Sequence, residues 1–158
     1  MLAGCYRSAP AGDVAKRGPC PSPYPAVSRK FSLKAANSGV HGLDTTLVPF
    51  AAQQVRVCTY DSVAGALTGT AVLTQPVAGR LEAATNRLGT TTSRTTTPLT
   101  CRAFGKSLLT FTTATQGVAV AVADCGDGVV SNGTLTVAST RPWLDELAAL
   151  TPTPPNGA

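Results

Sequence analysis

The chain has 158 residues, of which 43% are hydrophobic, so we expect one folded domain with tails. Charged residues make up 13% of the chain, compared with roughly 25% in typical soluble domains, and the net charge is +5 with a pI of about 9.2. The basic residues are scattered and only 5% of residues are aromatic, which excludes the basic stripe with interleaved aromatic rings of a nucleic-acid surface. We expect no nucleic-acid partner.

The chain opens with its sharpest short motif. Leu2-Ala3-Gly4-Cys5 resembles the lipobox of bacterial lipoproteins, in which the signal peptide is cut before the cysteine and a diacylglycerol is attached to its sulfur. The resemblance implies that Cys5 is lipidated and that its acyl chains hold the protein at the membrane, on the extracytoplasmic side. No basic or apolar leader precedes the motif, so either a signal peptide lies upstream of Met1 or the match is accidental and Cys5 is a free thiol.

The composition then divides the chain. We expect residues 1–19 to be the lipobox-like start and a flexible tether. Residues 20–42 are predicted to be an extended lead-in rich in Pro, Ser and basic residues, because closely spaced prolines prevent a helix. The domain is expected over residues 43–150, and residues 151–158 form a disordered, frayed tail. No run reaches the roughly 18 apolar residues that a membrane-spanning helix needs.

A hairpin and a helix are predicted first within the domain. Residues 54–60 and 67–73 are rich in β-branched and aromatic residues and flank a turn cluster, which predicts two paired strands. Thr74 predicts a helix N-cap, with Pro76 in the first turn, and Gly89 predicts the end of this helix. The apolar face of the helix consists of Val77, Leu81, Ala84 and Leu88.

A second hairpin is predicted after a polar, Thr-rich loop. Its strands are expected at residues 107–113 and 118–123. One further strand is expected between residues 129 and 138, where Asn132-Gly133 supplies a turn.

The end of the domain predicts a second helix. Ser139 or Thr140 is the expected N-cap, with Pro142 early in the helix. Its apolar face carries Trp143, Leu147 and Leu150, and Trp143 is expected in the core or capping it. Together the elements predict an α+β fold, an antiparallel sheet of four or five strands with one helix packed across it and a C-terminal helix.

The number of cysteines indicates the cellular compartment in which the protein folds. If Cys5 is lipidated, Cys20, Cys58, Cys101 and Cys125 remain. An even set in an exported chain predicts two disulfides, and four cysteines allow three pairings. The alternative is four buried thiols in a cytosolic protein. A zinc site is not expected, because the chain has no C-x-x-C pair and one histidine.

No stretch carries a self-sufficient catalytic motif. A Ser-His-Asp triad would need His41, the single histidine, which lies in a Gly-containing lead-in and is expected to be an exposed loop residue. Asp124-Cys125-Gly126-Asp127-Gly128 is interpreted as a turn, not as a cation site. We therefore predict a protein that is not an enzyme, with no catalytic residues, metal or cofactor.

Short motifs across residues 20–135 resemble a recurrent pattern in uncharacterised exported (lipo)proteins of actinobacteria. The resemblance implies export and no particular activity. The motifs are Cys20-Pro21, Leu47-Val48-Pro49, Val57-Cys58-Thr59-Tyr60, Leu67-Thr68-Gly69, Leu81, Asn86-Arg87-Leu88, Cys101, Cys125 and Asn132-Gly133.

The order of a strand with Cys58, a helix, Cys101, a hairpin and Cys125 is more remotely similar to the Streptomyces subtilisin inhibitor family. That family has an antiparallel sheet with a helix across it, and a disulfide joins a cysteine before the hairpin to one after it. The resemblance implies a Cys101–Cys125 disulfide, which suits two neighbouring hairpin strands. Cys20 is then left to pin the lead-in to Cys58.

The same resemblance implies a protease-binding loop at Arg102, Ala103 and Phe104, with the scissile bond between Ala103 and Phe104. Arg102 stands where that family has proline. Two functions are therefore expected. The first is an extracytoplasmic, lipid-anchored, non-catalytic protein that binds an unknown partner. The second is a serine protease inhibitor that uses the loop after Cys101.

Overall fold

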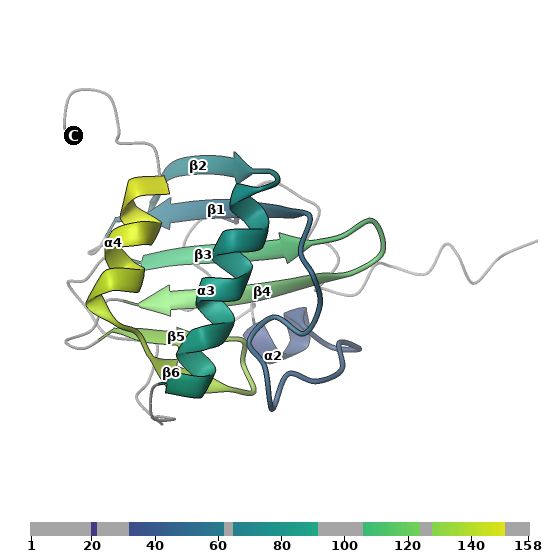
Figure 1. The fold of residues 1–158 in the computed structure, drawn as a ribbon. Helices are drawn as coiled ribbons and strands as arrows, with labels where there is room; N and C mark the ends of the chain where they lie inside the picture. Colours follow the sequence, from purple (N-terminus) through teal and green to yellow (C-terminus); the bar gives the residue numbers. More distant parts are fainter. Residues whose placement is uncertain (1–19, 22–31, 62–64, 92–105, 124–127, 151–158) are drawn as a thin grey trace, which may run out of the picture.

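The computed structural model describes residues 20–21, 32–61, 65–91, 106–123 and 128–150, which form an α+β fold, as predicted. An antiparallel sheet carries helices on its two faces (Figure 1). The elements in chain order are α2 (Leu33–Ala36), β1 (Gln54–Tyr60), β2 (Leu67–Leu73), α3 (Val77–Thr91), β3 (Lys106–Thr112), β4 (Gly117–Ala123), β5 (Val129–Ser131), β6 (Thr136–Ala138) and α4 (Arg141–Leu150).

The sheet has six strands in the order β2-β1-β3-β4-β5-β6, where four or five were predicted. The difference lies between residues 129 and 138, for which one strand was expected. Two short strands, β5 and β6, lie there and pair antiparallel with each other. They are joined by a turn at Asn132-Gly133 in which Gly133 has a φ of +91°, a conformation that glycine adopts without strain.

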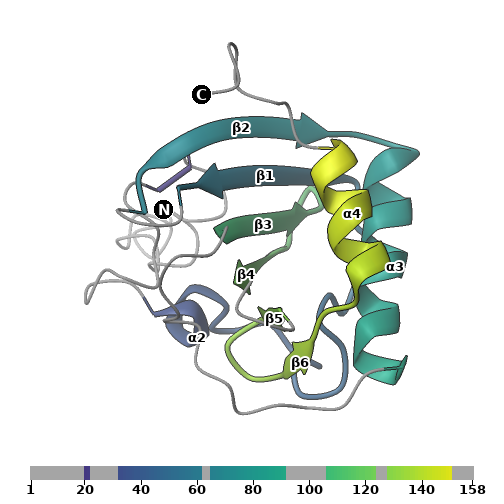
Figure 2. The same ribbon diagram turned by 90° about the vertical axis from the view of Figure 1, so that its left-hand side faces the viewer.

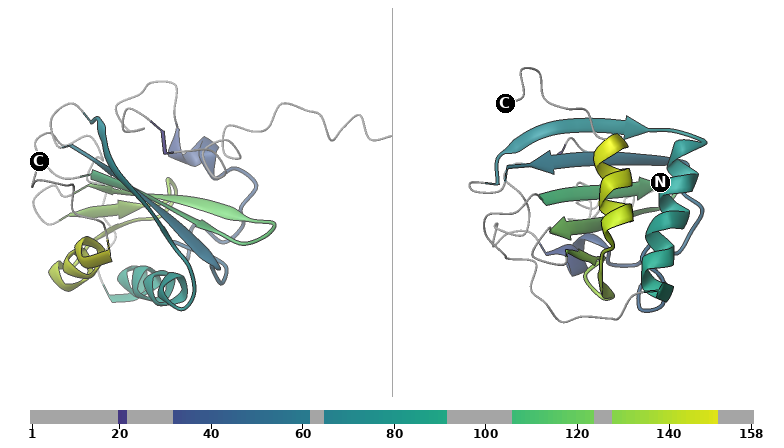
Figure 3. Two further views of the ribbon diagram at one scale, coloured as in Figure 1. Left: turned by 90° about the horizontal axis from the view of Figure 1, so that it is seen from above. Right: turned by 60° about the vertical axis from the view of Figure 1, so that its left-hand side comes forward.

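The alternation along β1 divides the interior into two cores. Val55 and Val57 belong to the larger core, which lies between the sheet and the two long helices. Cys58 and Tyr60 belong to a smaller core on the opposite face, which we call the back face. Helices α3 and α4 lie next to each other over one face of the sheet (Figure 2). Helix α2 lies against β4 on the back face (Figure 3).

The start of α3 differs from the prediction. The helix begins at Val77, and Gln75, not Thr74, supplies a side-chain acceptor: its Oε1 accepts a hydrogen bond from the N–H of Gly79 at 3.1 Å. The same side chain donates from Nε2 to the carbonyl oxygen of Ala52 at 2.7 Å. This contact from a distant segment holds the glutamine over the helix entrance, and local sequence rules do not include it.

The end of α3 differs as well. Gly89, the predicted C-cap, stays helical and the helix continues to Thr91. A Cβ built on Gly89 would lie 3.7 Å from Cδ2 of Leu135, in the turn between β5 and β6. Packing against this turn carries the helix past a residue that would otherwise favour its end.

The lead-in predicted to be extended contains α2 instead. The Oγ of Ser32 accepts a hydrogen bond from the N–H of Ala35 at 3.2 Å and caps the helix. The buried side chain of Asn37, just after the helix, donates to the carbonyl oxygen of Ala119 at 2.8 Å and accepts from its N–H at 2.7 Å. Four residues cannot form a stable helix alone, so these bonds to β4 account for α2.

One buried side chain fixes the irregular segment between α2 and β1. Asn132 is 0% exposed and forms five hydrogen bonds. Its Nδ2 donates to three carbonyl oxygens of that segment at 3.0, 3.2 and 3.3 Å, and its Oδ1 accepts from two N–H groups of its own turn at 3.0 and 2.8 Å. The partners are Leu43, Thr46, Leu47, Thr134 and Leu135.

A side chain of α3 fixes the same segment further along. The Oδ1 of Asn86 accepts a hydrogen bond from the N–H of Val48 at 2.8 Å, and its Nδ2 donates to the carbonyl oxygen of Val48 at 2.9 Å. The amide thus pairs with the backbone as a neighbouring strand would. The irregular segment is therefore bonded to α3 as well as to the turn at Asn132, although it has no regular structure.

Candidate functional site

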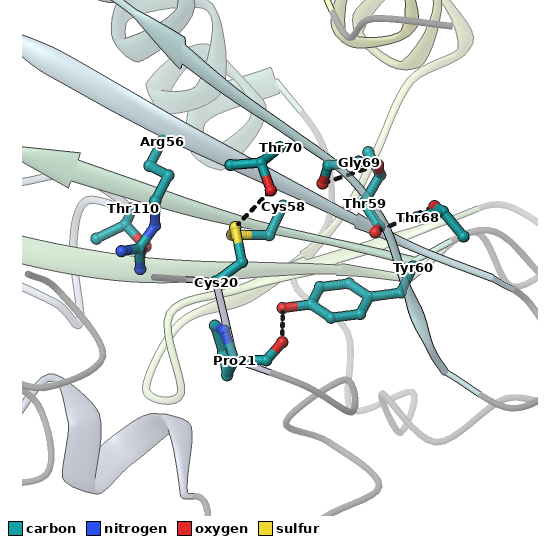
Figure 4. The surroundings of a disulfide bond; sticks show 10 residues. All are labelled: Cys20, Pro21, Arg56, Cys58, Thr59, Tyr60, Thr68, Gly69, Thr70 and Thr110. Carbon is teal, nitrogen blue, oxygen red and sulfur yellow. Dashed lines mark hydrogen bonds between the residues drawn. A yellow bond between two sulfur atoms is a disulfide. The ribbon is translucent and has the colours of Figure 1, made fainter. Parts of the chain in front are cut away.

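A disulfide ties the N-terminal part of the chain to the centre of the sheet (Figure 4). Cys20 and Cys58 are bonded with an S–S distance of 1.98 Å and a Cα–Cα distance of 5.7 Å, so this predicted pairing is present. Cys58 is fully buried on β1. The Oγ1 of Thr70 on β2 donates to the Sγ of Cys20 at 3.5 Å. The bond holds residue 20 on the back face of the sheet.

A second contact holds the chain beside this disulfide (Figure 4). The hydroxyl of Tyr60 donates to the carbonyl oxygen of Pro21 at 2.6 Å. Burial raises the pKa of Tyr60, and the positive charge of Arg56 opposes this rise in part. Tyr60 is therefore a neutral hydrogen-bond donor at physiological pH, and its proton is committed to Pro21. The contact orders the chain and does not prepare a nucleophile.

Arg56 is a buried charged residue on the back face. Its Nη2 donates to the Oγ1 of Thr110 on β3 at 3.4 Å. Burial lowers the pKa of Arg56, and Tyr60 acts in the opposite direction. An arginine keeps its charge under such a shift because its ordinary pKa is far above neutral pH.

A hollow of about 220 Å³ lies between α3 and α4 on the other side of the molecule. Trp143 forms part of its wall and is 3% exposed. The indole Nε1 donates to the Oγ1 of Thr85 at 3.2 Å, which fixes the ring. The residues around the hollow are Ala84, Arg87, Leu88, Thr140, Pro142, Trp143 and Glu146.

The size of this hollow limits what it can hold. Pockets for whole small molecules usually enclose about 300–1,000 Å³, and this hollow encloses about 220 Å³. It suits a single side chain better than a complete ligand. Its wall is partly apolar, and exposed Arg87 and Glu146 bring both signs of charge to it.

Several residues predicted to be functional lie outside the described part of the chain. These are Cys5, Cys101, Arg102, Ala103, Phe104 and Cys125. The structure does describe hairpin β3–β4, which lies in the sequence between Cys101 and Cys125. Lys106 of β3 lies opposite Ala123 of β4. The start of β3 and the end of β4 therefore lie at the same end of the sheet.

The remaining candidates do not form a reactive cluster in the described ranges. His41 is exposed in the loop before β1, as predicted. Within residues 20–21, 32–61, 65–91, 106–123 and 128–150, no three His, Cys, Asp or Glu side chains come together as a possible metal site. No helix in this part of the chain is both long and apolar enough to cross a membrane.

Comparisons of the chain with protein families, with curated proteins and with solved structures find no match. Its function is therefore inferred from its own residues and geometry.

Proposed function

We propose that this chain is an extracytoplasmic, lipid-anchored, non-catalytic binding protein. The observation that carries the proposal is the disulfide between Cys20 and Cys58. Disulfides persist in oxidising compartments and are rare in the cytosol. The lipobox-like Leu2-Ala3-Gly4-Cys5 precedes this disulfide in the chain and supports an anchor at the membrane.

The hollow between α3 and α4 supports a protein as the partner. A protein partner can insert one side chain into a hollow while the rest of its surface lies outside, and such anchors dominate many protein interfaces. The volume of about 220 Å³ matches this use. The single histidine of the chain, His41, is exposed in a loop and does not line this hollow.

We expect the protein to partition with membranes when it is expressed with the coding sequence upstream of Met1. The Cys5→Ser variant should move to the soluble fraction, because it removes the sulfur that would carry the lipid. The measurement is fractionation of cells with detection of the protein, combined with metabolic labelling by radioactive palmitate.

Ser8→Ala in the same segment is the matched control and should leave both the label and the membrane fraction unchanged. Wild-type protein found entirely in the soluble fraction, without label, would remove the anchor from the proposal.

A second function is a serine protease inhibitor of the subtilisin-inhibitor type. The observation that favours it is the pairing of β3 with β4, which brings Lys106 opposite Ala123. A disulfide between Cys101 and Cys125 would join the segments that leave this hairpin. Such a bond would pre-organise Arg102 and Ala103 and reduce the entropy lost when a protease binds.

Titration of subtilisin, trypsin and elastase with the purified protein separates the two functions. Under the first function we expect no inhibition at micromolar protein, with the Cys101–Cys125 bond verified by peptide mapping without reductant. Tight inhibition that is lost in Arg102→Ala or Ala103→Pro would establish the inhibitor instead. The control variant is Ala83→Ser, which changes an exposed position of α3 and should leave the result of the titration unchanged. A proline at this position would not serve, because it would break the helix.

A further inference from the structure

The two edges of the sheet are unlike. Strand β2 forms one edge with seven residues, and β6 forms the other with three. β6 also contacts α3. Among the described residues, β2 pairs with β1 alone, so its outer backbone N–H and C=O groups face away from the sheet.

Strand β2 lacks the features that usually prevent edge-to-edge pairing. Soluble proteins protect long edge strands with charged residues, prolines or bulges. The sequence of β2, LTGTAVL, contains no charge and no proline. Its pairing with β1 is regular from Val55 to Thr59, and the irregularity lies at the hairpin end, beside Tyr60. No strand of the described ranges covers the greater part of this edge, so a further strand could pair with it.

One side chain on this strand is exposed in an unusual way. Val72 is 55% exposed and is the large hydrophobic residue that stands out on the surface of the described chain. It lies opposite Arg56 in the register, on the back face with Thr70. A strand added beside β2 would cover Val72 as well as the backbone groups.

We propose that the edge of β2 is an interface between two copies of this chain, joined antiparallel through β2 of each. A strand without charge does not repel its own copy, although the whole chain carries +5. A two-fold axis perpendicular to the sheet makes the edge self-complementary and places both Val72 side chains on the same face of the joined sheet.

The second edge explains why the assembly stops at two copies. After pairing through β2, the free edges of the joined sheet are the two β6 strands, each of three residues. Such very short edges offer few backbone groups to a further strand, which is one way that proteins limit edge-to-edge pairing. The proposal does not depend on the lipid anchor. Because one strand pair buries less than the roughly 1,200 Å² of a stable interface, the dissociation constant should be micromolar.

The test is sedimentation equilibrium of the purified full chain over a wide range of concentration. Every sample carries Cys5→Ser, so that no disulfide forms between chains at that position. We expect a monomer–dimer equilibrium, and Val72→Lys should raise the dissociation constant at least about tenfold, because each lysine would bring a charge against the uncharged partner strand. Circular dichroism and the melting temperature of each variant check that the fold is unchanged.

Two matched variants identify the edge as the cause. Val72→Thr keeps a β-branched, uncharged side chain and should retain the dimer. Ala83→Lys adds the same charge on the exposed face of α3 and should also retain it. Hydrogen exchange should show that amides of β2 become slower as the protein concentration rises.

The contrary results are distinct. A monomer at every concentration, or a dimer that Val72→Lys does not weaken, overturns the proposal. Equal weakening by Val72→Lys and Ala83→Lys assigns the effect to net charge and overturns it too. A monomer in which the β2 amides are nevertheless protected would show that another segment of the same chain covers the edge.

Discussion

Replacing Asn132 by alanine should lower the free energy of unfolding by about 4 kcal/mol. The variant leaves three carbonyl oxygens, two of them buried, and two N–H groups without the side chain that binds them. Water cannot easily replace it, because Asn132 is 0% exposed. Trp143, the single tryptophan, is buried and reports unfolding by its fluorescence in a urea titration.

Two other variants provide comparisons for this loss of unfolding free energy. Thr134→Ala changes an exposed residue of the same turn and should cost less than about 0.5 kcal/mol. Asn86→Ala removes two bonds to the backbone of Val48 at a partly buried site and should fall between the two. If Asn132→Ala and Thr134→Ala are equally stable, Asn132 is a turn residue only and the role assigned to it is wrong.

Removing the disulfide should cost a similar amount. The double variant Cys20→Ala/Cys58→Ala opens a link across a sequence separation of 38 residues. The loop-closure relation gives a loss of about 4 kcal/mol for that length. The measurement is the urea midpoint and slope, followed by Trp143 fluorescence, without reductant so that other cysteines are unaffected.

Thr70→Val is the matched control for this double variant. It removes the hydrogen bond to the Sγ of Cys20 and keeps the disulfide, so its cost should be about 1 kcal/mol or less. A double variant within 1 kcal/mol of the wild type, on the scale of one ordinary hydrogen bond, would mean that the tie between Cys20 and β1 contributes little to the fold.

The parts of the fold that local patterns control could be predicted. Strands β1 and β2 have the predicted bounds, because β-branched residues alternate there between clear turns. Helix α4 begins after Thr140, one of the two predicted caps, whose Oγ1 accepts a hydrogen bond from the N–H of Trp143 at 3.4 Å. These signals lie within a few residues of the structure that they specify.

The parts that were missed depend on partners far along the chain. Asn37 bonds to Ala119 and Asn132 bonds to Leu43, and nothing near either asparagine in the sequence marks it as buried. The hollow between α3 and α4 was missed for the same reason. The apolar faces of both helices were predicted, including Trp143. The sequence did not predict that α3 and α4 lie side by side, because their packing on the sheet brings them together.

The Cys20–Cys58 bond also determines how a mechanical load would enter the domain. If Cys5 is held in the bilayer, a pull on the domain travels through the tether to Cys20 and crosses the disulfide into the middle of β1. The segment from residue 21 to residue 57 then carries no tension. The load meets a strand that is bonded on both sides, to β2 and β3. The attachment point therefore lies inside the sheet and not at a free end of the chain. With that anchor, the chain from residue 5 to residue 20 would hold the domain within about 50 Å of the membrane even when fully extended.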